Sequence, residues 1–290
     1  MSGMQRALER AEREGRLTWT QPGQTATLPP PDEPAPAPTV RSHGVRDTVP
    51  VAETRVRRTV DPADTKISPL FVVLHDPESA AAEQYRLLHM RVEAADHGRR
   101  IQLLTVTSPR LGEGKTTTSA NLALTIAREF QRRVVLVEAD LRRPVLASMF
   151  GLPPGPGLSE VLLGTATLDD ALVRLPDDHA YLLAAGSSAA RSVELVSSHG
   201  MQRVLETLRS RFDRIVVDSP PVTLADAHVL ARLADGILLV VCAGVTPRPA
   251  VESALAGLDR QRLLGIVVNQ VEGHTEAYRY TPTPLAESPS

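Results

Sequence analysis

Short apolar runs separated by longer mixed segments dominate the chain beyond residue 100. Several runs are apolar throughout rather than alternating, which is typical of strands buried on both faces of a sheet. The segments between them are long enough for helical crossovers, which parallel strands require. The pattern therefore predicts an α/β fold, a parallel sheet flanked by helices, with strands within 101–108, 133–140, 180–186, 214–221, 236–244 and 263–271.

The first part of the chain has a different pattern. Residues 1–19 place Met4 and Leu8 on one side of a short charged helix, either solvated or docked on a partner. Residues 20–68 are rich in proline without apolar periodicity, which predicts a disordered linker. A folded domain is expected over 69–272, and a disordered tail over 273–290. The domain should open with a strand-like run in "SPLFVVL", followed by a helix that carries Tyr85, Leu88 and Val92 on one side.

Composition narrows the class of protein. An apolar fraction of 42% in 290 residues is ample for a core, and a formal charge of -2 argues against a generally basic nucleic-acid binder. The longest apolar runs are about eight residues, far below the roughly 20 that cross a bilayer. These features predict a cytoplasmic protein. The single cysteine, Cys242, lies in an apolar run and is expected to be a buried small side chain.

The stretch "TSPRLGEGKTTTSANLA" has the order strand, glycine loop, helix that a phosphate-binding loop requires. The chain has only two lysines, Lys66 and Lys115, and the second lies in this loop. A compact lysine charge can reach between the β- and γ-phosphates of a nucleotide, where a planar guanidinium would not fit. We therefore expect nucleotide binding through the loop residues Gly112, Glu113, Gly114, Lys115, Thr116 and Thr117, with the Thr116 hydroxyl on Mg²⁺ and Thr117 at the α-phosphate.

Acidic residues follow two of the predicted strands. Glu138 and Asp140 end the run "VVLVEAD" and are expected on the same side of the extended chain, while Asp218 ends "RIVVD". Carboxylates at strand ends near a triphosphate are suited to holding Mg²⁺, which takes only one or two protein ligands. We expect Asp140 and Asp218 to position the metal.

These motifs resemble those of the bacterial tyrosine kinases of capsule and exopolysaccharide synthesis over residues 76–272. "TSPRLGEGKTTTSANLA" is similar to their Walker A loop, "VVLVEADLRRP" to their second Walker segment and "FDRIVVDSPPV" to Walker B. "GLSEVLLG", "SVELVSS" and "ADGILLVVCAGVT" match in the same order. The opening helix and "HDPESAAAEQYRLL" resemble the subgroup that works beside exosortase-type export systems.

The resemblance implies a deviant P-loop NTPase fold and a tyrosine autokinase that uses ATP and Mg²⁺. Glu138 would accept or orient the tyrosine proton, Arg142 would balance developing charge, and Asn269 matches the position that reads adenine. Subunits would form a ring through Glu83 and Arg86, so that Tyr278 and Tyr280 of one tail reach a neighbour's site. A separate membrane chain-length regulator would activate the protein at the inner face of the membrane.

The chain departs from the family pattern at four places. Pro109 replaces the first loop glycine, Glu138 stands where an aspartate is usual, and His89 stands where the ring motif has its second arginine. The tyrosine cluster is reduced to Tyr278 and Tyr280. Two alternatives therefore stay open: a switch ATPase that modifies no tyrosine, although such proteins carry lysine where this chain has Arg110, and an inactive ATP-binding regulator.

Overall fold

The computed structural model describes residues 58–59, 66–95, 100–177, 179–187 and 191–271. The predicted N-terminal helix, most of the predicted linker and the predicted tail, with Tyr278 and Tyr280, lie outside this range. None of the helices in the described ranges has the length and apolar character needed to cross a bilayer.

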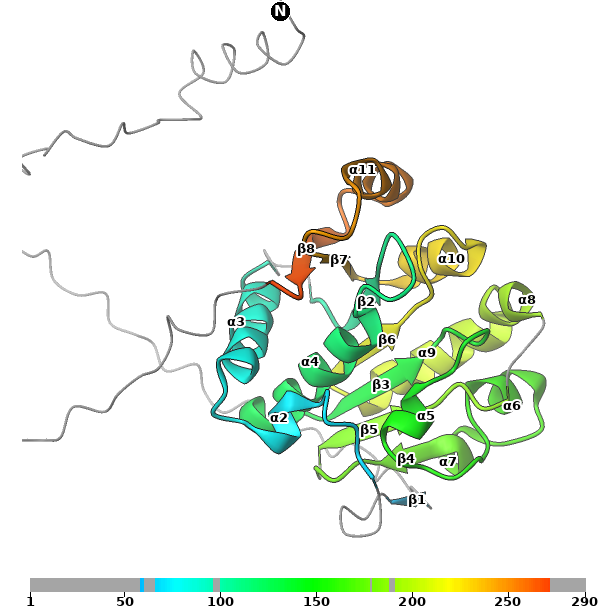
Figure 1. Ribbon diagram of the computed structural model, residues 1–290. Helices are drawn as coiled ribbons and strands as arrows, with labels where there is room; N and C mark the ends of the chain where they lie inside the picture. The colour runs from blue at the N-terminus through cyan, green and yellow to red at the C-terminus, as the bar shows by residue number, and fades with distance from the viewer. Residues whose placement is uncertain (1–57, 60–65, 96–99, 178, 188–190, 272–290) are drawn as a thin grey trace, which may run out of the picture. The chain divides into compact units, whose positions relative to one another are not determined.

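Within the described residues, one sheet of eight strands forms the centre of the fold, in the order β1-β4-β5-β3-β6-β2-β7-β8 (Figure 1). All six strands predicted beyond residue 100 are present. They are β2 (Leu103–Thr107), β3 (Val134–Glu138), β5 (Ala180–Leu183), β6 (Arg214–Asp218), β7 (Gly236–Cys242) and β8 (Leu263–Asn269). Neighbours among these six run parallel, as predicted.

Two short strands that the sequence analysis did not predict extend one edge of the sheet. β4 (Leu172–Arg174) pairs antiparallel with β5, and β1 (Arg58–Thr59) pairs parallel with β4. β1 lies inside the segment predicted to be a disordered linker. Two residues of that segment therefore belong to the sheet.

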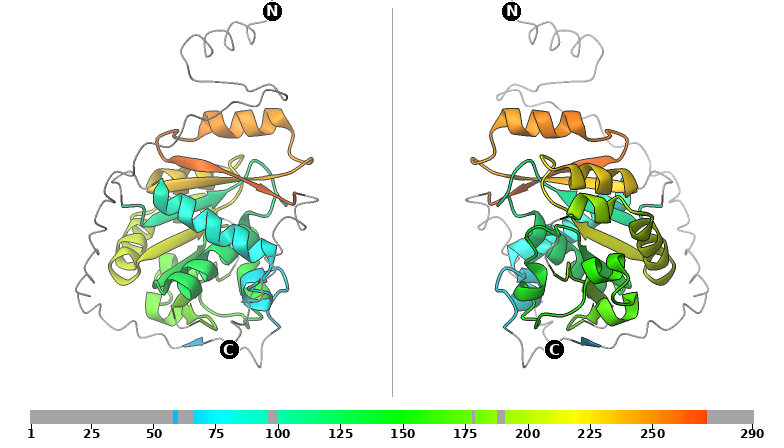
Figure 2. Two further views of the ribbon diagram at one scale, coloured as in Figure 1. Left: turned by 90° about the vertical axis from the view of Figure 1, so that its left-hand side faces the viewer. Right: turned by 90° about the vertical axis from the view of Figure 1, so that its right-hand side faces the viewer.

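The helices lie on both faces of the sheet, which Figure 2 shows in turn. Their bounds are α2 (Val72–His75), α3 (Ala80–Ala94), α4 (Lys115–Phe130), α5 (Leu146–Met149), α6 (Leu158–Leu163), α7 (Leu168–Ala171), α8 (Ser192–Val196), α9 (His199–Arg211), α10 (Ala225–Leu233) and α11 (Arg248–Gly257). Side chains from α2 to α5 pack in one core cluster, and those from α6 to α11 pack in the other.

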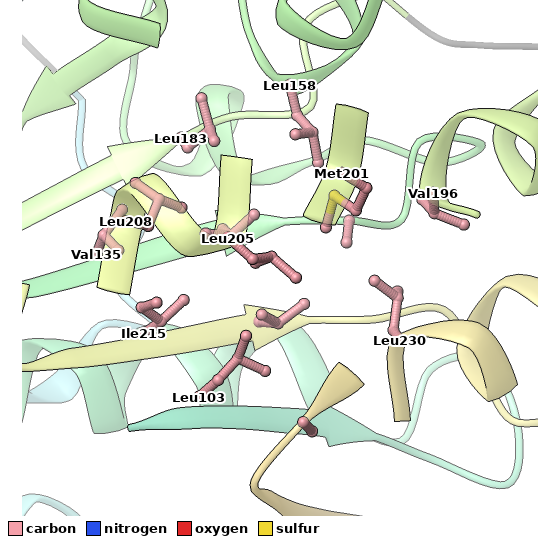
Figure 3. Packing of buried hydrophobic residues seen from close by; sticks show 14 of the residues in the cluster. Leu103, Val135, Leu158, Leu183, Val196, Met201, Leu205, Leu208, Ile215 and Leu230 are labelled. Atoms are coloured by element: carbon pink, nitrogen blue, oxygen red, sulfur yellow. The ribbon is translucent and has the colours of Figure 1, made fainter. Parts of the chain in front are cut away.

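Continuous apolar strands allow both clusters to form, because alternate residues of each strand face opposite sides. On one side, Leu205 and Leu208 of α9 pack with Ile215 of β6 and Leu103 of β2 (Figure 3). On the other side α4 is covered by the sheet and by α3, so residues 118–127 are all buried. A helix enclosed in this way holds its N-terminal residues in a fixed place.

The run "FVVL" is a helical turn, α2, rather than the strand that its composition predicts. Backbone groups of this run and of Leu70, just before it, are bound by side chains of α4. Asn121 accepts a hydrogen bond from Val73 N and donates one to Leu70 O, and Arg128 donates to Val73 O. The helix predicted next, α3, is confirmed, with Val92 buried and with Tyr85 and Leu88 packed on the core.

The carboxyl ends of the central strands lie level with one another. Asp218 of β6 pairs in register with Glu138 of β3 on one side and with Val106 of β2 on the other. Ligands of open parallel sheets bind at this edge. The acidic residues that were predicted at the strand ends therefore lie at the edge of the sheet where this fold favours a ligand site.

Candidate functional site

The loop between β2 and α4 has the backbone of an anion-binding turn. Gly112 and Gly114 adopt positive φ angles of 80° and 93°, and Gly114 is the N-cap of α4. A β-carbon at Gly114 would lie 1.9 Å from Nδ2 of Asn269, so only glycine fits there. The N-terminus of a 16-residue helix then points its free amides and its dipole at the loop.

Glu113 is part of this loop, but its side chain turns inward and is almost fully buried. Its carboxylate accepts hydrogen bonds from Arg110 N at 2.7 Å and from the Thr246 hydroxyl at 2.6 Å. Thr246 follows β7, so Glu113 ties the loop to the neighbouring connection. A contribution of Glu113 to nucleotide binding would come from its backbone.

Asn269, at the end of β8, is brought to the loop as expected. Its Nδ2 donates a hydrogen bond to Glu113 O at 3.1 Å. The contact fixes the edge strand against the phosphate loop. The adenine-reading role of Asn269 stays a prediction.

Lys115 lies between two carboxylates at the start of α4. Its Nζ is 3.3 Å from Oδ2 of Asp140 and 3.8 Å from Oδ1 of Asp218, and the residue is only 9% exposed. Thr116 donates from its hydroxyl to Oδ2 of Asp218 at 2.8 Å. Four residues from three separate segments are therefore brought together as the sequence predicts. Thr117 lies next to them, partly buried, with its carbonyl bound by Asn121.

Asp218 is fully buried, and burial raises its pKa to about 6. The charge of Lys115 and the hydrogen bond from Thr116 oppose this rise, while Glu138 and Asp140 add to it. The Oδ1 atom of Asp218 has no hydrogen-bond partner within the described ranges. A buried carboxylate oxygen that accepts no hydrogen bond, on the residue that also binds the Thr116 hydroxyl, belongs to a donor set that fits Mg²⁺.

Glu138 and Asp140 bind different partners, although both were predicted to serve the nucleotide site; burial raises the pKa of Glu138, and its backbone hydrogen bonds and the nearby Lys115 charge oppose the rise. Asp140 points at Lys115, whereas the carboxylate of Glu138 accepts hydrogen bonds from backbone amides of Val145, Leu146 and Ala185. The strand ends at Glu138, so the alternation of an extended chain does not continue to Asp140.

Arg142 is held by a residue that the sequence did not single out. Its Nε donates to Oδ2 of Asp226 at 3.2 Å, and Asp226 is fully buried in the first turn of α10. An acidic residue near a helix N-terminus is the only signal in the sequence, and four other described helices, α3, α6, α7 and α8, have one too. The pairing follows from the fold alone.

The residues predicted to make oligomer contacts lie on α3. Arg86 donates hydrogen bonds to Glu83 at 2.8 Å and to Glu129 of α4 at 3.2 Å. His89 is 2% exposed and packs on Phe130 with 4.0 Å between ring centroids, and burial lowers its pKa to about 4. His89 therefore faces the core, so a contact with another subunit at the third position of the motif is excluded in this conformation.

Comparison with known proteins identifies the domain. Residues 104–281 match the family model described as CobQ/CobB/MinD/ParA nucleotide binding domain. The chain is 33% identical to the tyrosine-protein kinase YwqD of Bacillus subtilis (strain 168), over 73% of this chain and 91% of that protein. It is 30% identical to the putative tyrosine-protein kinase CapB of Staphylococcus aureus, over 74% of this chain and 95% of that protein.

Other matches agree with these. The succinoglycan biosynthesis transport protein ExoP of Rhizobium meliloti (strain 1021) is 33% identical over 69% of this chain and 26% of its own length. The solved kinase domain of Escherichia coli tyrosine kinase ETK superimposes with a TM-score of 0.66 at 27% identity, over 75% of this chain and 86% of that chain. The solved structure of the chimerical protein CapA2B2 superimposes with a TM-score of 0.67 at 25% identity, over 74% of this chain and 94% of that chain.

Proposed function

This chain belongs to the bacterial tyrosine kinases, which share the CobQ/CobB/MinD/ParA nucleotide-binding domain, and we propose that it is an ATP-dependent tyrosine autokinase that regulates the synthesis or export of an exopolysaccharide. One observation carries the proposal. Lys115 lies buried between Asp140 and Asp218 at a helix N-terminus, with Thr116 on Asp218. Phosphoryl transfer needs this combination of a positive charge, loop amides and carboxylates.

In the proposed reaction, Lys115 and the loop amides hold the β- and γ-phosphates of ATP. The tyrosine oxygen bonds to the γ-phosphorus as the bond to the β,γ-bridging oxygen breaks, and the electron pair of that bond leaves with ADP. The phenolic proton passes to a carboxylate or to solvent. Thr116, Asp140 and Asp218 would hold Mg²⁺, which neutralises charge that develops on the phosphates. Arg142, oriented by Asp226, lies on the same connection as Asp140.

We also propose the partners that such a kinase uses. A separate membrane protein of the chain-length regulator type would activate the chain at the inner face of the membrane. Copies of the chain would form a ring with Glu83 and Arg86 at the contact. In the described structure Arg86 is bound to Glu83 and Glu129 of its own chain, so ring formation would need these bonds to be exchanged or extended.

The test is phosphate transfer to the tail. The purified chain is incubated with Mg·ATP and the cytoplasmic segment of the candidate regulator, and phosphosites are mapped by mass spectrometry. We expect phosphate on Tyr278 and Tyr280. Mixing a Lys115→Met chain with a Tyr278→Phe, Tyr280→Phe chain should label the tail of the Lys115→Met chain only when the other chain is present.

Two results would count against this function. Absence of tail phosphate in the wild type, with the regulator supplied, would overturn autokinase activity. ATP hydrolysis that continues under those conditions would indicate a switch ATPase instead. Label on the Lys115→Met chain when it is alone would show that phosphate transfer does not require Lys115.

A further inference from the structure

Glu138 is a glutamate with no exposed surface at the end of the central strand β3. One of its oxygens accepts hydrogen bonds from Val145 N and from Leu146 N, the latter at 2.7 Å. The other oxygen accepts one from Ala185 N at 3.0 Å. Both oxygens are therefore occupied by backbone amides of two different segments.

We propose that Glu138 is a positioning residue that fixes the connection carrying Asp140 and Arg142, and that it is not the group that accepts the tyrosine proton. The proposal rests on the proposed kinase function and replaces the role that the family resemblance implies for this position. It assigns to Glu138 the task of holding the start of α5 against the end of β5.

The contacts on either side support this task. The connection after β3 begins with Ala139 N bound to Asp218 O at 2.9 Å and continues with Asp140 on Lys115. It ends at Leu146, where Glu138 binds the first amides of α5. Glu138 thus bridges both ends of the connection, which leaves a short span with Asp140 and Arg142 between two fixed points.

A general base must approach the proton that it abstracts to within about 2.6–3.2 Å. The carboxylate of Glu138 would have to give up charge-assisted hydrogen bonds to reach a substrate, and those bonds are among the stronger ones in proteins. The extra methylene of glutamate, relative to aspartate, carries the oxygens past the strand end to these amides. Asp140 and Asp218 are the carboxylates that face Lys115.

The experiment compares Glu138→Gln and Glu138→Asp with a matched control, Glu160→Gln. Glu160 also accepts backbone amides, from Gly157 at 2.9 Å and from Ser187 at 3.1 Å, but it contacts none of the residues around Lys115. Three quantities are measured for each variant: single-turnover transfer against pH, affinity for fluorescent Mg·ADP, and hydrogen exchange at the bound amides.

A positioning role predicts a split that a base would not give. Glu138→Gln should slow transfer by about tenfold or less and weaken Mg·ADP by a factor of about three to ten, while the acid limb of the rate profile stays in place. Glu138→Asp should behave like Glu138→Gln, because the shorter arm cannot reach all three amides. Glu160→Gln should change melting temperature without changing either the rate or the affinity.

The opposite pattern overturns the proposal. A loss of about a hundredfold or more in rate with unchanged Mg·ADP affinity and a lost acid limb would make Glu138 the base. A wild-type rate of transfer in Glu138→Asp would also overturn the positioning role. If Glu138→Gln does not fold, the test rests on Glu138→Asp and on hydrogen exchange in the wild type. Rapid exchange of the Leu146 and Ala185 amides would refute the positioning role of Glu138.

The two proposals can fail separately. Should the wild type transfer no phosphate even with its regulator, the kinase function fails. Mg·ADP affinity and amide exchange would still show whether Glu138 organises the connection.

Discussion

Replacing Lys115 by methionine removes the cation that lies between Asp140 and Asp218. At an effective dielectric constant of about 20, a lysine charge contributes about 5 kcal/mol to a carboxylate at 3.3 Å and about 4 kcal/mol to one at 3.8 Å. Protonation of a carboxylate recovers part of this loss, so we expect the free energy of unfolding to fall by about 3–5 kcal/mol at most. Mg·ADP affinity should fall more than tenfold, at least about 1.4 kcal/mol.

The loss of stability should depend on pH in a defined direction. Asp218 has a folded pKa of about 6, above its ordinary 3.8, so its contribution is full below 3.8 and is lost as pH rises through 6. Because Lys115 lowers the pKa of Asp218, the variant's pKa lies higher still. Its deficit relative to wild type should therefore grow between pH 6 and pH 8.

Urea denaturation at pH 5 and pH 8 without metal or nucleotide, together with calorimetric titration of Mg·ADP, measures both effects. The matched control is Lys66→Met, since Lys66 is the chain's other lysine and is exposed. It should leave both quantities unchanged. Equal Mg·ADP affinity in Lys115→Met and wild type would refute the nucleotide site, and an equal deficit at both pH values would refute charge neutralisation by Lys115.

Three further predictions concern neighbouring contacts. Gly114→Ala should destabilise the protein by at least about 1–2 kcal/mol in urea denaturation, because Gly114 has a left-handed backbone with φ 93° and the added β-carbon would meet Asn269. Adding Asn269→Ala should recover the part of the loss that comes from this clash and leave the backbone strain. Wild-type affinity for Mg²⁺, titrated at fixed ADP, should fall as pH drops below about 6 because protons compete for Asp218, and the fall should be less steep in Asp218→Asn, where only the ADP phosphate still titrates. Arg142→Ala should cost about 1–3 kcal/mol by leaving the buried Asp226 charge unpaired, and adding Asp226→Asn should restore stability, as urea denaturation would show.

Local sequence was sufficient for the six longer strands, β2, β3, β5, β6, β7 and β8, and for the phosphate loop. These strands are largely apolar runs, and a run buried on both faces, as all of them except the edge strand β8 are, has few other stable structures. The loop needs glycine at positive φ and lysine at the helix start, and both requirements are met in one short stretch around Gly114 and Lys115. A function that depends on particular residue types adjacent in sequence can be recognised from the sequence alone.

Contacts between distant segments could not be found in this way. "FVVL" has the composition of a strand, yet Asn121 and Arg128 of α4 bind its polar backbone groups, so that it forms a turn of helix instead. Thr246 holds Glu113 from another connection, and Asp226 holds Arg142 from α10. Each partner is an ordinary polar residue in its own stretch, and only packing makes it specific.

Glu138 is the clearest case in which sequence was not sufficient, because its place at the end of β3 was predicted and the partners of its carboxylate were not. Alternation of side chains places residues two apart on one side only while the chain stays extended. β3 ends at Glu138, and the next residues turn so that Asp140 meets Lys115. Glu138 instead meets the amides at the start of α5 and the end of β5, whose place depends on the whole sheet. An acidic pair at a strand end therefore indicates a site, but the point where the strand stops decides which carboxylate can reach the ligand.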